Sequence, residues 1–351
     1  MNKRFYSRLP HHRTTALRLC VPFVAPVLAF ACTAPADGRG GSGDVAASTN
    51  SKPSKEISVG LSMYTLGSPY FAAQRSAVQE AVRQRGWTFR DTDARDRVDK
   101  QIADVEDLLA TGIDVLLLNP KDPLGLVPAT LAAKEAGVPV VCLDSAIDPS
   151  AYYITDVQAS NKQNGELVGR WLANTMGQTP MKIALLSGVQ GNPVGQKRRE
   201  GVFKGIIDQQ LASHGRAGFE IVAQGWGNWT RLEGMRAMED ILVAHPDANV
   251  LVAENDTMAL GARDAIKEAK RLDDILIAAA ADGQKEALAL IRQRQYGVTG
   301  LNNPGTIAHQ AVDVAERYLK GQRNFAKITY TEPAAIDYRN VDRFYNPAAA
   351  F

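Results

Sequence analysis

The stretch that decides the fold is Val250–Ala262, which reads VLVAENDTMALGA. Its opening residues are apolar, and a run of this kind is typical of a strand buried on both faces of a sheet. Glu254, Asn255 and Asp256 follow, and Thr257 then opens a helical pattern. Open α/β sheets bind ligands at the carboxyl ends of their strands. The stretch therefore predicts a strand, a ligand-facing loop and a helix.

The same arrangement recurs along the chain, where short apolar runs alternate with amphipathic stretches. Strands that alternate with helices of about 10–15 residues indicate parallel sheets covered by helices on both faces. The apolar runs outnumber the strands that a single sheet normally holds. The pattern therefore favours an α/β fold of two doubly wound parallel-sheet lobes. The predicted strands are Ile57–Met63, Val115–Leu118, Val138–Leu143, Ile183–Leu186, Phe219–Ala223, Val250–Ala253, Ile275–Ala280 and Gly297–Leu301.

Composition and charge narrow the class of protein. Hydrophobic residues make up 45% of the chain and charged residues 22%, as in soluble globular proteins. The formal net charge of +2 includes five Lys and Arg residues before residue 31, where no acidic residue occurs. The remaining chain is mildly acidic, which argues against nucleic acid as a partner.

The amino terminus has the layout of a secretory signal over residues 1–31. Basic residues come first, Leu19–Ala31 is a short apolar run, and Ala29 and Ala31 precede Cys32. The end of this segment resembles a bacterial lipobox in which Ala29 takes the usual leucine position. This resemblance predicts lipidation of Cys32. The alternative is a plain cleavage after Ala31. Either route predicts a periplasmic protein, and residues 32–55, rich in Gly, Ser and Ala, have the composition of a flexible tether.

The cysteines and the motifs that do not occur exclude several classes of protein. Cys142 lies in an apolar run and is expected to be a buried thiol, without a disulfide framework. No serine-nucleophile elbow or P-loop occurs, and the glycines of Gly188–Gly195 have the wrong spacing for a dinucleotide loop. Clustered metal ligands are also missing from the pattern. We therefore expect no enzyme, no cofactor and no metal.

Polar residues follow most of the predicted strands. Asp, Asn, Arg and Ser offer planar or forked hydrogen-bonding groups, and aromatic rings lie near them in the sequence. This combination suits a hydroxyl-rich ring, whose edges need hydrogen bonds and whose C–H faces stack on aromatic side chains. The groups are Tyr64–Phe71, Asn119, Asp144-Ser145, Ser187-Gly188, Lys197-Arg198-Arg199, Trp226, Trp229, Asn255-Asp256, Asp282 and Asn302-Asn303.

From Ile57 to Tyr330 the chain resembles the periplasmic sugar-binding proteins of the ribose-binding type, which are solute-binding components of ABC importers. Single motifs would be weak, but their order and intervals together are specific. The motifs are Ser68-Pro69-Tyr70-Phe71, Leu143-Asp144, Lys197–Phe203, Ala244-His245-Pro246-Asp247, ENDTMALGA, Ala281-Asp282-Gly283 and Asn302-Asn303-Pro304.

The resemblance implies a fold, a mode of binding and a set of ligand contacts. Two lobes joined by three crossovers would close around a monosaccharide or polyol, and a monomer would deliver it to a permease in the inner membrane. The N-terminal lobe would hold residues 56–155 and 303–330, and the C-terminal lobe residues 156–302 and 331–351. The implied contacts are Tyr64, Ser68, Tyr70, Phe71, Asp144, Arg199, Trp229, Asn255, Asp282 and Asn302.

Two departures from the family pattern bear on the ligand. Ser145 stands where such sugar binders often have arginine, and Ala281 stands where they often have an aromatic residue. The loss of a bidentate group and of a stacking ring changes the shape and the hydrogen bonding of the pocket. Trp226 and Trp229 could compensate. The ligand is therefore expected to differ from ribose.

Ordinary structural roles compete with these assignments. Asp144 could be a turn or cap residue, and Asn255 and Asp256 could cap the following helix. One residue of the pair Tyr70 and Phe71 is expected in the core. Trp226 could serve packing alone, and the basic run before Glu200 could be a solvated helix start.

Three non-enzymatic functions share this fold: an importer component, a sensory protein that presents its ligand to a chemoreceptor or histidine kinase, and a repressor. A repressor would need a DNA-binding segment where this chain has the signal and tether. Importer and sensor cannot be separated by the residues.

Overall fold

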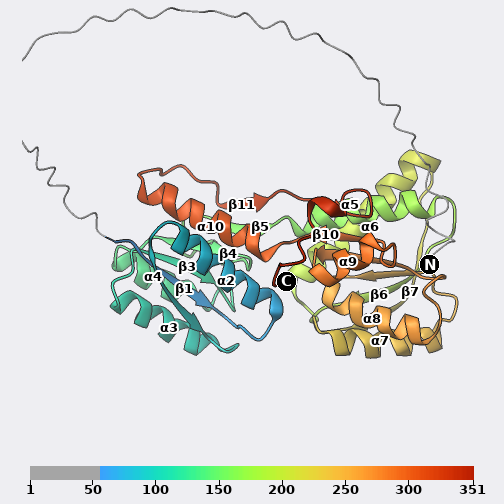
Figure 1. Ribbon diagram of the computed structural model, residues 1–351, viewed down its shortest axis with the longest axis horizontal. Helices are drawn as coiled ribbons and strands as arrows, with labels where there is room; N and C mark the ends of the chain where they lie inside the picture. The colour runs from blue at the N-terminus through green and yellow to red at the C-terminus, as the bar shows by residue number, and fades with distance from the viewer. Residues whose placement is uncertain (1–55) are drawn as a thin grey trace, which may run out of the picture. The chain divides into compact units, whose positions relative to one another are not determined.

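The computed structural model describes residues 56–351, and the predicted signal, Cys32 and tether lie outside the described residues. Strands and helices alternate through most of this range (Figure 1). The strands are β1 Ser58–Met63, β2 Thr88–Asp93, β3 Val115–Asn119, β4 Val140–Leu143, β5 Asp156–Ala159, β6 Lys182–Ser187, β7 Glu220–Trp226, β8 Val250–Ala253, β9 Leu276–Asp282, β10 Val298–Leu301, β11 Ile328–Thr331 and β12 Ala335–Ile336. The helices are α2 Pro69–Gln84, α3 Val98–Ala110, α4 Val127–Glu135, α5 Asn161–Met176, α6 Pro193–His214, α7 Arg231–Ala244, α8 Asp256–Glu268, α9 Lys285–Arg292, α10 Pro304–Leu319 and the 3₁₀ helix η1 Val341–Arg343.

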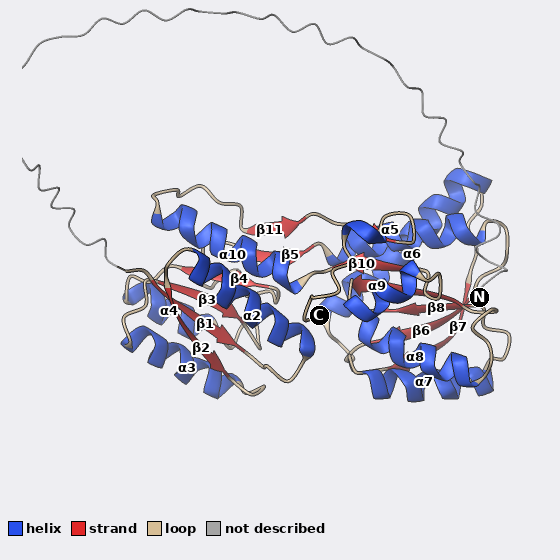
Figure 2. Ribbon diagram, viewed as in Figure 1, coloured by secondary structure: helices blue, strands red, loops and turns tan. Residues whose placement is uncertain are grey.

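The strands form two sheets, as the sequence predicted, and each sheet has six strands. The order in the first sheet is β11-β5-β4-β3-β1-β2, and all its pairings are parallel. The second sheet has the order β12-β10-β9-β8-β6-β7, in which only the short strand β12 is antiparallel to its neighbour. Helices lie on both faces of each sheet (Figure 2). The doubly wound α/β fold is therefore confirmed.

Each sheet separates two apolar cores because successive residues of a central strand point to opposite faces. In β3, Val115 and Leu117 pack with α2 and α10, whereas Leu116 and Leu118 pack with α3 and α4. Cys142 belongs to the latter core and is fully buried, as expected for a structural thiol. The second sheet has the same organisation, with α7, α8 and α9 on one face and α5 and α6 on the other.

The chain passes between the two sheets three times, but the crossovers differ slightly from the predicted boundaries. β5 belongs to the first sheet, so the first crossover follows Ala159 and not residue 155. The second lies after Leu301, and the third lies after Thr331, the end of β11. The N-terminal lobe, as we use the term below, is the first sheet with α2, α3, α4 and α10. The C-terminal lobe is the second sheet with the other helices.

Helices α5 and α6 pack with their backbones unusually close. A Cβ atom on Gly169 would lie 2.0 Å from the carbonyl oxygen of Val202, and one on Gly165 would lie 2.4 Å from that of Arg198. Likewise, Cβ atoms on Gly201 and Gly205 of α6 would lie 2.2 and 2.1 Å from carbonyl oxygens of α5. Glycine is required at these four positions because any side chain would push the helices apart. The close approach brings Asn161, in the first turn of α5, to Arg198, in the second turn of α6.

Within residues 56–351, no helix combines the length and the apolar character needed to cross a membrane.

Candidate ligand-binding site

A buried tyrosine connects the ends of two strands that belong to different sheets. Ser68 caps α2 by accepting a hydrogen bond from the backbone of Tyr70, which fixes the start of the helix. The hydroxyl of Tyr70 lies 2.7 Å from Oδ1 of Asp144, after β4, and 3.0 Å from Oδ1 of Asn302, after β10. A phenol has a single proton, so it donates to one of these oxygens at a time.

The polar network continues from Asn302 into the C-terminal lobe. Nδ2 of Asn302 donates to Oδ1 of Asp282 at 3.1 Å, and the same oxygen lies 3.1 Å from Nη2 of Arg198. Asn302, Asp282 and Arg198 are each about 5% exposed. Four of the predicted contacts, Tyr70, Asp144, Asp282 and Asn302, therefore lie in one continuous network.

Arg198 is the centre of this network on the C-terminal lobe. Its Nε donates to Oδ1 of Asn161, and its Nη1 donates to the backbone oxygen of Glu254, at 2.8 and 2.9 Å. Its guanidinium carbon lies 5.8 Å from the ring centre of Trp229, a cation–π distance. Each nitrogen of the guanidinium thus has a separate partner, which fixes its plane.

The prediction singled out Arg199 in this region, and the structure brings Arg198 to the network instead. Arg199 forms an ion pair with the buried carboxylate of Glu254 and lies 3.3 Å from Ser187 Oγ. The helical period could have distinguished the two arginines. Arg198 shares the buried face of α6 with Val202 and Gly205, at spacings of four and seven residues. Arg198 is therefore the arginine that belongs to the buried network, whereas a ligand contact from Arg199 stays a prediction.

The ENDTMALGA loop has a structural role that supports the site. Asn255 caps α8 through its side-chain oxygen, which accepts a hydrogen bond from the backbone of Met258. Asp256 does not cap the helix. It is fully buried, and its Oδ2 accepts hydrogen bonds from the backbone nitrogens of Asp282, Gly283 and Gln284. Asp256 therefore holds the loop that carries Asp282.

An aromatic group stands beside Tyr70. Phe71 meets Tyr70 at a ring-centre distance of 5.3 Å and Tyr64 at 4.8 Å, both edge to face. Phe71 also packs against the apolar core, whereas the hydroxyl of Tyr70 belongs to the polar network. Phe71 thus packs against the core as expected of one member of the pair, and a ligand contact from either residue stays a prediction.

Two predicted contacts have a backbone conformation that L-residues seldom adopt. Asp144 has a φ of 68° and Trp229 has a φ of 63°. Residues held in this left-handed region are often found at ligand sites, where the surrounding structure maintains the strain. The conformation places Trp229 against Gly188, where a Cβ atom would lie 2.1 Å from the indole ring.

Burial changes the charge behaviour of the acidic side chains. Burial raises the pKa of Asp144 to about 6, although the hydrogen bond from Tyr70 and the charge of Arg198 oppose the shift. Burial also raises the pKa of Asp282, while Arg198 and Asn302 oppose this shift. Arg198 thus forms an ion pair with Asp282 and acts on Asp144 through its charge, in a poorly solvated setting. Such a group accepts hydrogen bonds from hydroxyl groups and also donates them through Arg198 and Asn302.

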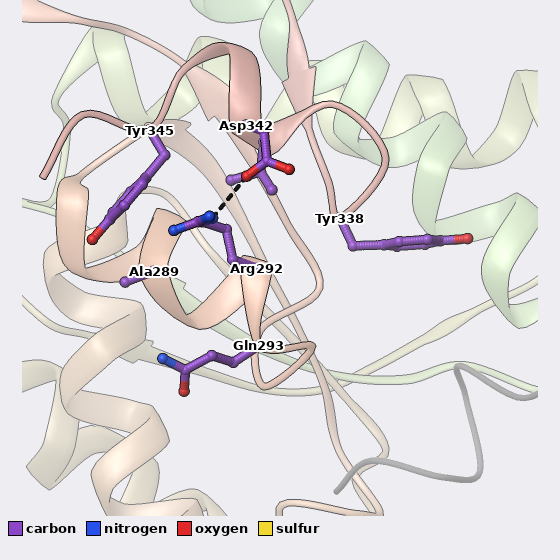
Figure 3. A pocket seen from close by; sticks show the side chains of 7 residues that line it. Ala289, Arg292, Gln293, Tyr338, Asp342 and Tyr345 are labelled. Atoms are coloured by element: carbon purple, nitrogen blue, oxygen red, sulfur yellow. Dashed lines mark hydrogen bonds and ion pairs between the residues drawn. The ribbon is translucent and has the colours of Figure 1, made fainter.

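A separate pocket of about 360 Å³ lies in the C-terminal lobe between α9 and η1 (Figure 3). Arg292 crosses it to form an ion pair with Asp342 at 2.7 Å, and the guanidinium carbon of Arg292 lies 4.6 Å from the ring centre of Tyr345. None of the predicted ligand contacts lines this pocket. In the described part of the chain, His, Cys, Asp and Glu side chains form no group of three or more that could hold a metal ion.

Comparison with known proteins agrees with this architecture. A family model described as a periplasmic binding protein domain matches residues 59–323. The ribose import binding protein of Bacillus subtilis (strain 168) is 34% identical over 275 residues, which cover 78% of this chain and 86% of that protein.

Two solved structures resemble the fold closely. An ABC transporter periplasmic solute binding protein from Actinobacillus succinogenes 130z with bound D-allose has a TM-score of 0.75 and 25% identity, covering 82% of this chain and all of that one. An ABC transporter solute binding protein from Mycobacterium smegmatis with bound glycerol has a TM-score of 0.72 and 30% identity, covering 84% and 98%. The chain therefore belongs to the periplasmic binding protein family.

Proposed function

We propose that the protein is the solute-binding component of an ABC importer and binds a monosaccharide or polyol between its two lobes. Tyr70 and Asp144 would hold the ligand from the N-terminal lobe, and Arg198, Trp229 and Asp282 would hold it from the C-terminal lobe. The observation that carries the proposal is the network from Asp144 through Tyr70, Asn302 and Asp282 to Arg198. It places donors and acceptors at the strand ends of both sheets.

The chemistry of this network suits hydroxyl groups better than it suits charged ligands. Asp144 and Asp282 offer acceptors, and Arg198 and Asn302 offer donors, so a sugar hydroxyl can both donate and accept. Trp229 and the aromatic group at Tyr70 supply faces for C–H groups. A free anion would meet two carboxylates, and a free cation would meet Arg198. The known relatives named above bind ribose, D-allose or glycerol by their names and titles, which supports the same ligand class here.

Hinge closure is the proposed mode of binding. The three crossovers after Ala159, Leu301 and Thr331 are the only covalent links between the two sheets in residues 56–351. A ligand that contacts both lobes stabilises the arrangement in which its contacts are complete. Asn302, at the second crossover, joins this hinge to the site. The closed surface is what a permease would recognise.

The lipid anchor belongs to the same proposal. Cys32 follows the apolar part of the amino-terminal segment, and 23 residues separate it from Glu56. A lipid on Cys32 would retain the binding domain at the membrane while the segment between them lets it reach the permease.

A thermal-shift screen tests the function. The purified protein is first unfolded and refolded to remove carried-over ligand, and then heated with D-ribose, D-allose, other monosaccharides, polyols and sugar acids. A compound at 100 times its dissociation constant stabilises the folded state by about 2.7 kcal/mol, which is a shift of a few degrees for a protein of this size. A shift with one compound supports the proposal. If no compound shifts the unfolding temperature, the proposal is contradicted.

A further inference from the structure

The last part of the chain is attached to the C-terminal lobe and is outside the residues that the family model matches. Val341 is 2% exposed, and Phe344 and Tyr345 pack against the core that α7, α8 and α9 share. The ion pair of Asp342 with Arg292 and the contact of Arg292 with Tyr345 fix the segment further (Figure 3). Residues 341–345 are therefore held against the C-terminal lobe, which fixes where the following residues begin.

From there, the final residues run toward the ligand site. Nζ of Lys285 contacts the backbone oxygen of Ala349. Lys285 begins α9 and stands three residues after Asp282. The contact therefore places the segment beside the strand end that carries Asp282.

The segment ends in an aromatic contact with the other lobe. The ring of Phe351 meets the ring of Tyr70 at a centre distance of 5.3 Å and an angle of 88°, which is an edge-to-face pair. The ribbon accordingly ends beside the start of α2 (Figure 1). Phe351 is partly buried, and its ring lies against the ring of Tyr70, whose hydroxyl lies within hydrogen-bond distance of Asp144 and Asn302.

We propose that Phe351 is a further ligand-contacting residue, which supplies an apolar wall to the site from the C-terminal segment. The inference rests on the proposed function, because it names another residue of the same site. The hydrogen-bonding groups described above meet the edges of a hydroxylated ring. The C–H face of such a ring needs an apolar partner, and the ring of Phe351 lies at the point where the C-terminal segment meets Tyr70 of the other lobe.

The proposal predicts a preference among ligands. A ring such as a pyranose offers a C–H face to Phe351, whereas glycerol offers no ring face. Loss of the aromatic ring should therefore weaken the binding of a cyclic sugar more than it weakens the binding of glycerol. An aromatic contact of this kind corresponds to a change in affinity of about tenfold.

The test is calorimetric titration of the unaltered protein, Phe351→Ala and Phe351→Leu with D-ribose, D-allose and glycerol. Val243→Ala is the matched control, because Val243 is an apolar side chain that is 86% exposed on α7. We expect Phe351→Ala to raise the dissociation constant of the better-bound cyclic sugar about tenfold. Phe351→Leu should have a smaller effect, and Val243→Ala should have none. The unfolding temperature without sugar should fall by no more than a few degrees in the Phe351 variants, because only the contact with Tyr70 is lost, and should be unchanged in Val243→Ala.

The outcomes separate this inference from the function on which it rests. If the unaltered protein binds a sugar and Phe351→Ala binds it equally well, the inference is wrong and the proposed function stands. Tighter binding by Phe351→Ala also overturns it, since the ring would then compete with the sugar. If the unaltered protein binds none of these probes and no compound of the thermal-shift screen, the proposed function fails, and the inference falls with it.

Discussion

Arg198 and Asp282 form an ion pair in which Nη2 lies 3.1 Å from Oδ1 and both side chains are almost completely buried. Burial of two charges is costly unless further hydrogen bonds compensate for lost hydration. Arg198 donates hydrogen bonds to Asn161 and to the backbone oxygen of Glu254, and Asp282 accepts one from Asn302. These hydrogen bonds replace part of the hydration that the two charged side chains lose. The pair is thus held in one geometry before a ligand arrives, which lowers the entropic cost of binding.

The first prediction separates the two neighbouring arginines. Lysine at position 198 would keep the charge but could not reach Asn161, Glu254 and Asp282 with a planar fork. We expect Arg198→Lys to weaken sugar binding by about 10- to 100-fold, as for the loss of one or two hydrogen bonds to charged groups. Arg199→Lys is the matched control and should change the affinity by less than about threefold. Calorimetric titration that finds the larger loss in Arg199→Lys would restore Arg199 as the ligand contact.

The second prediction concerns pH. The ligand-free pKa of Asp144 is about 6, and its ionised form is the better acceptor for hydroxyl groups. Binding should therefore weaken as the pH falls through 6, by about tenfold between pH 7.5 and pH 5. Asp144→Asn should flatten this dependence. An unaltered protein whose affinity is constant across this range would contradict the role of the carboxylate.

The stability of the ligand-free protein should change in the opposite direction. The folded state raises the pKa of Asp144 above its usual value of 3.8, so the folded protein binds more protons than the unfolded chain between these values. The contribution of Asp144 to the free energy of unfolding therefore increases as the pH falls from about 6 toward 3.8. Denaturant titrations of the unaltered protein and Asp144→Asn should show this difference. Equal pH profiles for the two proteins would rule it out.

The third prediction tests the close packing of α5 and α6. Gly169→Ala places a Cβ atom 2.0 Å from a backbone oxygen, so the helices must move apart. We expect a loss of about 1–3 kcal/mol in the free energy of unfolding, as for other overpacked sites. Gly218→Ala is the control, since nothing lies within 4 Å of the position that its Cβ atom would take. Denaturant unfolding measures both variants, and an unaffected Gly169→Ala would show that the helices can separate freely.

The same variant should also weaken sugar binding. Arg198 lies on α6 and its partner Asn161 lies on α5, so separation of the helices would pull the two side chains apart. A Gly169→Ala protein that is less stable but binds with full affinity would show that the helix contact does not position Arg198.

The fourth prediction concerns the membrane anchor. Cys32→Ser removes the thiol that a lipid would modify, so the protein should move from the membrane fraction to the soluble periplasmic fraction. Fractionation of cells that express either form checks this, with Cys142→Ser as the control because Cys142 is buried. Membrane association that survives Cys32→Ser would contradict lipidation at this residue.

The sequence predicted the central strands well because burial on both faces leaves continuous apolar runs. The opening stretch became β8 at Val250–Ala253, followed by α8 from Asp256. β2, with the sequence TFRDTD, was not predicted, since this edge strand is only partly buried and lacks such a run. β5 and β11 escaped prediction for a related reason, because DVQA and ITYT have no continuous apolar pattern. The missing β5 accounts for the shift of the first lobe boundary.

The residues of the polar network were partly predictable, whereas their contact with a ligand stays a prediction. Strand ends pointed to Asp144, Asp282 and Asn302, because the ends of parallel strands meet at one edge of a sheet. The helical phase of α6 contained the signal for Arg198, but the neighbouring arginine obscured it. The contact of Phe351 with Tyr70 had no local signal, since it joins residues from opposite ends of the described chain.

The most direct test of the account is calorimetric titration of the refolded protein and of Asp144→Ala with D-ribose, D-allose and a panel of monosaccharides and polyols. We expect one sugar or polyol to bind the unaltered protein in a one-to-one complex. Asp144→Ala should lose this binding while its unfolding temperature shows that it remains folded. A refolded protein that binds no sugar or polyol, or an Asp144→Ala protein that keeps its affinity, would contradict the account.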